Sequence, residues 1–247
     1  MQQRIPVFGT AQRWLGVTAL ISAAALVGCA TQTQQTVPPG PTAEQQQLIA
    51  DSQSTLSNFL RDPDMTWFQQ HLGQARGVLI SPAVVKAGFI FGGSGGRAVL
   101  YTRNAQSGRW TGPAFYNLGA ASVGFQAGIS VSETVVLVMT EKGINSLMSS
   151  SFKLGGDASI AVGPVGAGAG TDITTDFVGF SRSKGVYGGL NLEGGVVTIA
   201  DDWNNAYYGR VVTPVDIAIR SNVRGPTPNR LADELDRATA RRTSSSQ

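Results

Sequence analysis

The chain has 247 residues, 42% of them hydrophobic and only 14% charged, with 31 glycines and a formal net charge of +3. Charged residues usually make up about 25% of a soluble domain, so the low charge and the many glycines favour short strands joined by tight turns. A disordered or collagen-like chain is excluded, because the sequence has neither a long polar tract nor a Gly-X-Y period.

Charge is divided unevenly along the chain. Arg4 and Arg13 lie in a segment that we expect to be removed, which leaves 17 basic residues (19 minus 2) against 16 acidic ones. After Ile219, six arginines stand against three acids, so this tail has a charge of +3 and the remaining body about −2. Such a body lacks the concentrated basic face of a nucleic-acid-binding domain, and we expect no nucleic-acid partner.

The first residues have the pattern of a secretory signal. A basic, acid-free start is followed by Leu15–Val27, LGVTALISAAALV, which carries no charge. The run is too short for a membrane-spanning helix of about 20 residues. It therefore predicts a signal peptide over residues 1–28.

The apolar run ends in Leu26-Val27-Gly28-Cys29, which resembles the lipobox of bacterial lipoproteins. We expect Cys29 to carry the lipid, through a diacylglycerol on its sulfur and a palmitate-type chain on its amine. Two or three chains anchor a protein far more firmly than one, since each buried methylene contributes about 0.8 kcal/mol. The alternative is an ordinary buried cysteine. Ala30, in place of an aspartate, favours the outer membrane and a position facing the periplasm.

A polar, proline-containing tether follows over residues 29–43, and a folded domain is expected over 44–220. The first helix is predicted from Glu44 to Arg61. One of its faces is apolar and either packs on the core or contacts a membrane; it consists of Leu48, Ile49, Leu56, Phe59 and Leu60. Asp62-Pro63-Asp64 ends this helix, and a second short one should run from Met65 to about Gly73 or Ala75.

Beyond this point the apolar period changes to two, or to short apolar runs between glycines and prolines. The predicted strands are GVLISP, AGFIFGG, RAVLYTR, SVGFQAGISV, ETVVLVMT, DASIAVG, DFVGFSR, GVYGGLNLEG and GVVTIAD. Short helices are expected over 141–150, over 201–208 and after Thr213-Pro214. The fold class is therefore α+β, mainly β, with antiparallel sheets curled into a barrel or sandwich. Residues 221–247 form a basic, partly disordered tail in which LADELDRATARR could be helical, with an Asp233–Arg237 ion pair.

Gly92-Gly93-Ser94-Gly95-Gly96 fits the G-x-S-x-G pattern of serine hydrolases. A serine nucleophile needs a base within hydrogen-bond reach, and the only histidine, His71, precedes Ser94, whereas in hydrolases of this type the histidine comes last. RAVLYTR continues as a strand, so the glycines read as a hairpin loop. A hydrolase acting through Ser94 is the weakest of the functional hypotheses.

Other catalytic or metal-binding patterns are absent from the sequence. It contains no G-x-x-x-x-G-K-[ST] loop, and a zinc site is not expected with one histidine and one cysteine that we expect to be lipidated. Five aspartates could in principle bind calcium but lack EF-hand spacing: Asp157, Asp172, Asp176, Asp201 and Asp202. We therefore expect no enzyme, no catalytic residue, no metal and no cofactor.

With these residues laid out, the body resembles the SYLF domain family, which includes yeast actin-patch proteins and lipid-binding proteins of plants and animals. The resemblance covers about 45–220 and is carried by ARGVLISPAVVKAGFIFGGSGGRAVL, GRWTGPAFYNLGAASVGFQAGIS, VVLVMTEKGINSLMSSSFKLGGDASIAVGPVGAGA and SKGVYGGLNLEGGVVTIADDWNNAYYG. It implies membrane-lipid binding. The actin binding of fungal members is not expected in a bacterial periplasm.

The resemblance makes the basic residues of the strand-and-turn body candidates for anionic headgroups. They are Lys86, Arg97, Arg109, Lys153 and Lys184, each of which is otherwise a solvated surface charge. Trp110 and Trp203 could lie at a membrane interface or in the core. The leading hypothesis is a non-enzymatic, lipid-anchored envelope protein that binds membrane lipids. The alternative is a structural or assembly lipoprotein that forms oligomers or binds an envelope protein.

Overall fold

The computed structural model describes residues 40–88, 91–123, 128–164, 174–183, 186–187, 194–226 and 228–243. All of them belong to one compact unit of the chain, Thr36–Gln247. Cys29 and Lys184 lie outside the described residues. No helix within the described ranges is long and apolar enough to cross a membrane.

The N-terminal helices form as the sequence predicts. Helix α1 spans Ala43–Arg61 and begins with a capping box, in which Thr42 and Gln45 exchange side-chain-to-backbone hydrogen bonds. It ends at Asp62, whose extended backbone is the conformation that a following proline favours. The chain then continues through η1 (Pro63–Met65), α2 (Thr66–His71) and η2 (Leu72–Gln74).

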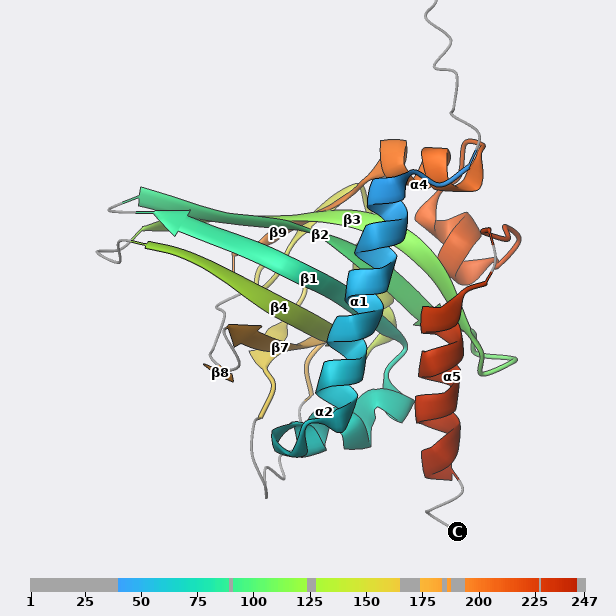
Figure 1. Cartoon of the computed structure of the whole chain (residues 1–247), viewed down its shortest axis with the longest axis horizontal. Coiled ribbons are helices and arrows are strands. Elements are labelled where there is room, and N and C mark those ends of the chain that lie inside the picture. Colours follow the sequence, from blue (N-terminus) through green and yellow to red (C-terminus); the bar gives the residue numbers. More distant parts are fainter. Residues whose placement is uncertain are drawn as a thin grey trace, which may run out of the picture. The chain divides into compact units, whose positions relative to one another are not determined.

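One sheet dominates the described part of the chain (Figure 1). Its strands are β1 (Gly77–Gly88), β2 (Phe91–Arg103), β3 (Trp110–Val123), β4 (Gly128–Val138), β5 (Ser151–Lys153), β6 (Ile160–Val162), β7 (Phe177–Ser183), β8 (Val186–Tyr187) and β9 (Val196–Ile199). They are arranged in the order β5-β9-β3-β2-β1-β4-β7-β6, with β8 beside β7. All pairs are antiparallel except β6 with β7.

The sheet is curled into a half-barrel. Phe152 of β5, at one end of the strand order, stacks on Phe177 of β7, near the other end, with ring centroids 5.6 Å apart. The two ends of the sheet therefore face each other across an inner face. The mixed, mainly antiparallel, curled fold with N-terminal helices confirms the predicted class.

Successive side chains of the central strands point alternately to the two faces of the sheet. On the outer face, Val78, Val99 and Leu137 join a core with residues of α1, α2 and α5. On the inner face, Leu79 and Leu100 join a second core, which also contains Phe152 and Phe177. Figure 1 shows α1 crossing the outer face, with α5 beside it.

The remaining helices connect and brace the strands. They are α3 (Glu141–Leu147), α4 (Asp201–Tyr208), the π-helical turn η3 (Val215–Ile219) and α5 (Arg230–Thr243). Asn204 of α4 is fully buried, and its side-chain amide bonds both the N–H and the C=O of Phe115 in β3, at 2.8 and 3.1 Å. In the tail segment, α5 buries Leu231 and Leu235 completely in the outer core.

The glycine run Gly92–Gly96 is not a hairpin loop, as the sequence suggested, but part of strand β2. It pairs residue for residue with β3, and Gly92–Gly95 pair also with the end of β1. Strand β1 ends at Gly88 and β2 begins at Phe91, so the glycine run lies inside β2. Strand β3 was not among the predicted strands, because its glycines, proline and alanines have low β-propensity and only the surrounding sheet makes them extended.

Candidate functional site

Strands β1 to β4 extend beyond the helices at one end of the sheet, which we call the overhang (83–88, 91–96, 118–123 and 128–132). Figure 1 shows these strand ends projecting away from α1 and α5. Four large apolar side chains are exposed there: Val85 (45%), Phe91 (77%), Ile129 (76%) and Val131 (49%). Scattered exposed apolar residues are normal, but a group on neighbouring strands marks an interaction surface.

These four side chains share the outer face. Val85 pairs directly with Val131, and Ile129 is two residues away from Val131 along β4. Phe91 lies an even number of residues from Val99, which faces the helix-covered core. The apolar stripe that α1 covers over the middle of the sheet therefore continues, uncovered, onto the overhang.

A bulge in β1 brings these residues into line. One extra residue lies in β1 between Ser81 and Val84, so the alternation of the strand shifts by one position there. Gly96 of β2 lies against this bulge, and a Cβ at that position would be only 2.5 Å from the carbonyl oxygen of Ala83. The glycine is thus required by a close approach of two backbones.

The predicted apolar face of α1 packs on the core. Leu56 and Phe59 are fully buried, and Leu48, Ile49 and Leu60 are partly buried against the same cluster. The helix is therefore engaged with the sheet, and of the two interpretations of this face the structure shows core packing.

The basic candidates do not gather at one place. Lys86 is exposed on the overhang. The guanidinium of Arg97 lies 3.8 Å from the ring centroid of Trp203, a cation–π contact, and Arg109 forms an ion pair of 3.4 Å with Asp236. Lys153 is exposed on β5, away from these. As headgroup ligands these residues stay predictions, and Lys86 is the one that lies within the apolar overhang.

The two tryptophans that could have met a membrane interface belong to the body of the domain. Trp110 is 3% exposed, and its indole N–H donates to Thr239 of α5 at 3.4 Å. Trp203 is partly buried and packs edge-to-face on Phe115. Both side chains therefore help to attach helices to the sheet.

Ser94 lies in mid-strand in β2, where it pairs with Lys86 and Ala120. His71 is on the second helix, stacked on Trp67 with ring centroids 3.8 Å apart, and its Nδ1 is 2.8 Å from the carbonyl oxygen of Trp67. The turn from strand to helix that exposes a catalytic serine is replaced here by a continuous strand.

Asp176, one of the five aspartates that could in principle bind calcium, is a structural residue. It is buried, and it accepts hydrogen bonds from the hydroxyls of Thr140 and Ser159 and from the backbone N–H of Ser159. Burial alone would raise its pKa, but these bonds and the nearby Lys142 ammonium outweigh burial and lower the pKa to about 2. Within the described ranges, no group of three His, Cys, Asp or Glu could hold a metal ion.

Buried tyrosines also have shifted pKa values. Burial raises the pKa of Tyr207 to about 12, and it raises the pKa values of Tyr101 and Tyr116 further above the ordinary range. The Tyr116 hydroxyl donates to the carbonyl of Leu147 at 2.7 Å. The Tyr101 hydroxyl donates to the Asn229 side chain at 3.0 Å, so these two hydroxyls stay neutral and act as hydrogen-bond donors.

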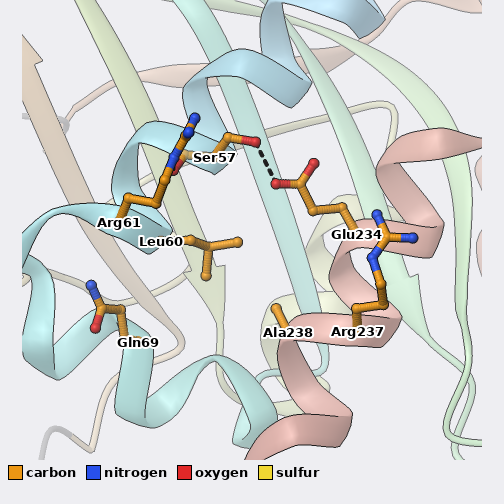
Figure 2. A pocket seen from close by; sticks show the side chains of 7 residues that line it. All are labelled: Ser57, Leu60, Arg61, Gln69, Glu234, Arg237 and Ala238. Carbon is orange, nitrogen blue, oxygen red and sulfur yellow. Dashed lines mark hydrogen bonds between the residues drawn. The ribbon is translucent and has the colours of Figure 1, made fainter.

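A groove of about 580 Å³ lies between α1, α2 and α5 (Figure 2). The Ser57 hydroxyl of α1 donates to the Glu234 carboxylate of α5, which also accepts from Gln53 at 3.1 Å. Arg61 and Arg237 lie on opposite walls (Figure 2), and in the described part of the chain neither has a carboxylate partner. The expected Asp233–Arg237 pair is therefore not formed, and the Glu234 contacts join α5 to α1.

Sequence reasoning missed the overhang as an exposed surface. It did identify the alternation that places Ile129 and Val131 on one side, but a two-residue period cannot tell a covered strand end from an uncovered one. Phe91 fell in a predicted strand and carried no signal of exposure. The lengths of the helices relative to the strands decide which apolar residues stay uncovered.

Comparisons with known proteins found a family model and relatives that match part of this chain. Residues 119–240 match the family model described as "Ysc84: Las17-binding protein actin regulator". Protein YSC84 of Saccharomyces cerevisiae is 30% identical over 145 residues, covering 56% of this chain and 31% of the yeast protein. The SH3 domain-containing YSC84-like protein 1 of Xenopus laevis is 28% identical over 144 residues, covering 56% of this chain and 42% of the frog protein.

The human SH3 domain-containing YSC84-like protein 1 is 25% identical over 173 residues, covering 68% of this chain and 50% of the human protein. The chain thus spans half or less of the length of these relatives. The family model is described as a binding and regulatory protein, and another yeast relative is named LAS seventeen-binding protein 3. The residues that match the family model run from the end of β3 into α5. The chain belongs to the Ysc84, or SYLF, domain family.

Proposed function

We propose that this protein is a lipid-anchored protein of the bacterial cell envelope whose SYLF domain binds membrane lipids through the overhang. The observation that carries the proposal is the group of four exposed apolar side chains on one face of neighbouring strand ends. The lipobox at Cys29 supports the anchor and a position at the outer membrane. No catalytic chemistry is part of the proposal.

Magnitudes indicate which force holds the overhang to a bilayer. Burying a large apolar side chain contributes about 1.5–3 kcal/mol, and Phe91 and Ile129 each expose about three quarters of their surface. A lysine near an anionic membrane contributes about 1 kcal/mol, and the described overhang contains Lys86 as its single charged residue. Insertion of apolar side chains thus contributes more to binding than charge does, and anionic headgroups add a smaller preference.

The test is co-sedimentation of residues 36–247, the compact unit that holds both cores, with vesicles of phosphatidylethanolamine and phosphatidylglycerol. We expect binding that weakens less than about tenfold between low and high salt, because one charge is involved. Ile129→Ser should weaken binding about tenfold or more, since it removes roughly 1.4 kcal/mol or more of transfer free energy.

Val211→Ser is the matched control, because Val211 is 79% exposed but lies outside the overhang, between α4 and η3. It should bind vesicles like the unmodified protein. Absence of vesicle binding at low salt, or equal effects of the two substitutions, would contradict the proposal.

Light scattering on the same protein tests the alternative of an assembly lipoprotein. If the overhang instead contacts a second copy, the protein forms a stable oligomer without lipid affinity, and Ile129→Ser dissociates it. The actin and Las17 binding named for the family model is not part of the proposal, because it describes eukaryotic relatives.

A further inference from the structure

A cation lies on the same face of the sheet as the exposed apolar side chains of the overhang. Arg97 of β2 is an even number of residues from both Phe91 and Val99, so it points to the outer face. Lys86 follows Val85 in β1 and therefore points to the opposite face. Arg97 is thus a basic residue at the border of the apolar surface, and it is exposed.

The side chain of Arg97 is held by an aromatic ring and not by an acid. Its guanidinium carbon lies 3.8 Å from the ring centroid of Trp203, which is fixed in turn by its edge-to-face contact with Phe115. Within the described ranges Arg97 forms no ion pair, not even with Asp201 or Asp202, which precede Trp203 in α4. A stacked guanidinium has N–H donors at its edge, and these remain available to an oxyanion.

The sheet beside Arg97 has a bare surface. Gly95 and Gly119 are paired on the outer face of β2 and β3, about 7 Å along the strands from Arg97. A Cβ at Gly119 would have no atom within 4 Å, so the space above this pair is open. Val85 pairs with Gly95 from the other side. A group lying on the glycine pair would therefore have the guanidinium on one side and the apolar surface on the other.

The N-terminal end of the domain lies close to Trp203. The side-chain amide of Gln45, in the first turn of α1, donates to the carbonyl of Trp203 at 2.9 Å, and Figure 1 shows α4 beside the beginning of α1. Eleven residues separate Cys29 from Gly40, where the described chain begins, and this length spans at most about 40 Å. An anchor at Cys29 would therefore limit how far this end of the domain can move from a bilayer.

We propose that Arg97, positioned by Trp203, binds the phosphate of a phospholipid headgroup when the apolar side chains of the overhang enter the bilayer. This inference rests on the proposed function and deepens it, because it names the headgroup chemistry and the residue that binds it. A guanidinium suits a phosphate, since two of its N–H groups donate to two oxygens at once. Headgroup phosphates lie just outside the hydrocarbon core, where a cation at the border of an inserted apolar surface would be.

The first test compares membranes with and without phosphate. Vesicles of phosphatidylethanolamine and phosphatidylglycerol carry a phosphate on every lipid, whereas vesicles of digalactosyldiacylglycerol carry none. In residues 36–247, Arg97→Gln should lower the affinity for the phospholipid vesicles about fivefold and leave the affinity for the galactolipid vesicles unchanged. The unchanged affinity also shows that the variant is folded. An equal loss on both membranes, or no loss on phospholipid, would overturn the proposal.

Arg61→Gln is the matched control. It removes the same charge from an exposed arginine at the other end of α1, which has no carboxylate partner in the described part of the chain. Both affinities should stay unchanged.

Vesicles of phosphatidylcholine separate phosphate from net surface charge, because this lipid has a phosphate but no net charge. Arg97→Gln should lower the affinity for them about twofold. A loss confined to the vesicles with phosphatidylglycerol would show a response to surface charge and contradict a phosphate contact.

A double-mutant cycle tests the positioning role of the ring. Trp203→Leu keeps the charge of Arg97 but removes the ring face, so it should lower the affinity for phospholipid severalfold and not the affinity for galactolipid. Added to Arg97→Gln, it should cause no further loss, because no guanidinium is left to position. Losses that multiply would show that Trp203 acts apart from Arg97. Urea unfolding checks the variant, and an unfolded Trp203→Leu is replaced by Trp203→Phe.

The two proposals fail in different ways. A protein whose binding is weakened by Ile129→Ser but not by Arg97→Gln lacks the phosphate contact and keeps the overhang as its membrane surface. A protein that binds phospholipid through Arg97, but neither responds to Ile129→Ser nor binds galactolipid, keeps the phosphate contact and contradicts apolar insertion.

Discussion

At the scale of single residues, the fold depends on polar side chains that satisfy buried backbone groups. Asn204 bonds both backbone groups of Phe115 and so attaches α4 to β3 as another strand would. Asp176 joins three elements: Thr140 at the start of α3, Ser159 before β6 and its own position before β7. Removing one partner from such a network leaves buried groups unsatisfied, which costs about 1–3 kcal/mol each.

Asp176 predicts a specific dependence of stability on pH. Its folded pKa of about 2 lies below the ordinary value of 3.8, so the charged form stabilises the folded state above pH 4 by about 2 kcal/mol. This contribution is lost as the pH falls from about 4 toward 2. Urea unfolding should therefore show Asp176→Asn less stable than the unmodified protein by about 2 kcal/mol at neutral pH, and by about half of that near pH 3.

Asp51→Asn is the control, because Asp51 is exposed on α1 and bonds only Gln47 of the same helix in the described part of the chain. Its stability should follow that of the unmodified protein within about 0.5 kcal/mol at both pH values. The difference in unfolding free energy between Asp176→Asn and the unmodified protein should become smaller at acid pH. If it stays the same, the carboxylate charge is not the stabilising feature.

At the scale of elements, the bulge in β1 determines which side chains reach each face of the overhang. Without the extra residue between Ser81 and Val84, Val85 would point inward and Lys86 outward. The bulge is held by Ser81, whose hydroxyl donates to the carbonyl of Arg97 at 2.8 Å, and by the absence of a side chain at Gly96. The proposed lipid contact of the overhang depends on this register.

Gly96→Ala should therefore destabilise the sheet. The added Cβ would meet the carbonyl oxygen of Ala83 at 2.5 Å and the Cα of Val84 at 3.3 Å, and forcing a methyl group into such a space costs about 1–3 kcal/mol. Gly119→Ala, in the neighbouring strand β3, is the matched control, because a Cβ there has no atom within 4 Å. Denaturant midpoints of the two variants give the comparison, and equal midpoints would mean that the bulge does not need the glycine.

At the scale of the whole molecule, helices cover one part of the outer face and leave the strand ends bare. Helix α5 belongs to this cover: Leu231 and Leu235 are fully buried, and Asp236 accepts from the backbone N–H of Trp110 at 2.9 Å. The cover ends before Val85 and Val131, where no helix of the described chain shields the sheet. An anchored protein would hold this bare end at high local concentration near a bilayer.

The anchor itself gives a prediction. Cys29→Ser replaces the thiol that diacylglycerol would alkylate, so incorporation of labelled palmitate in bacterial cells should fall to background. Thr31→Ser, two residues further on, is expected to incorporate palmitate normally. Labelling that persists in the Cys29→Ser protein would show that the lipid is attached elsewhere.

Much of the architecture follows from local sequence patterns. The helix over 43–61, the short helices after Asp62, α3 and α4 are each specified by caps, prolines and apolar period, which act over a few residues. The antiparallel, curled class follows from many short apolar runs without regular helix alternation. The full length of strands β2 and β3 cannot be predicted from local sequence patterns, because glycine and alanine have low β-propensity.

What the sequence by itself determined is therefore the class of fold, the expected anchor at Cys29 and the lack of a suitably placed histidine for Ser94. The tertiary structure alone decided that the apolar face of α1 is core and that Phe91 and Ile129 are bare. The physical reason is that exposure depends on which distant element covers a residue. The bulge determines which face of the sheet a side chain points to, and the length of a helix determines whether that face is covered. Neither can be predicted from the alternation within a single strand.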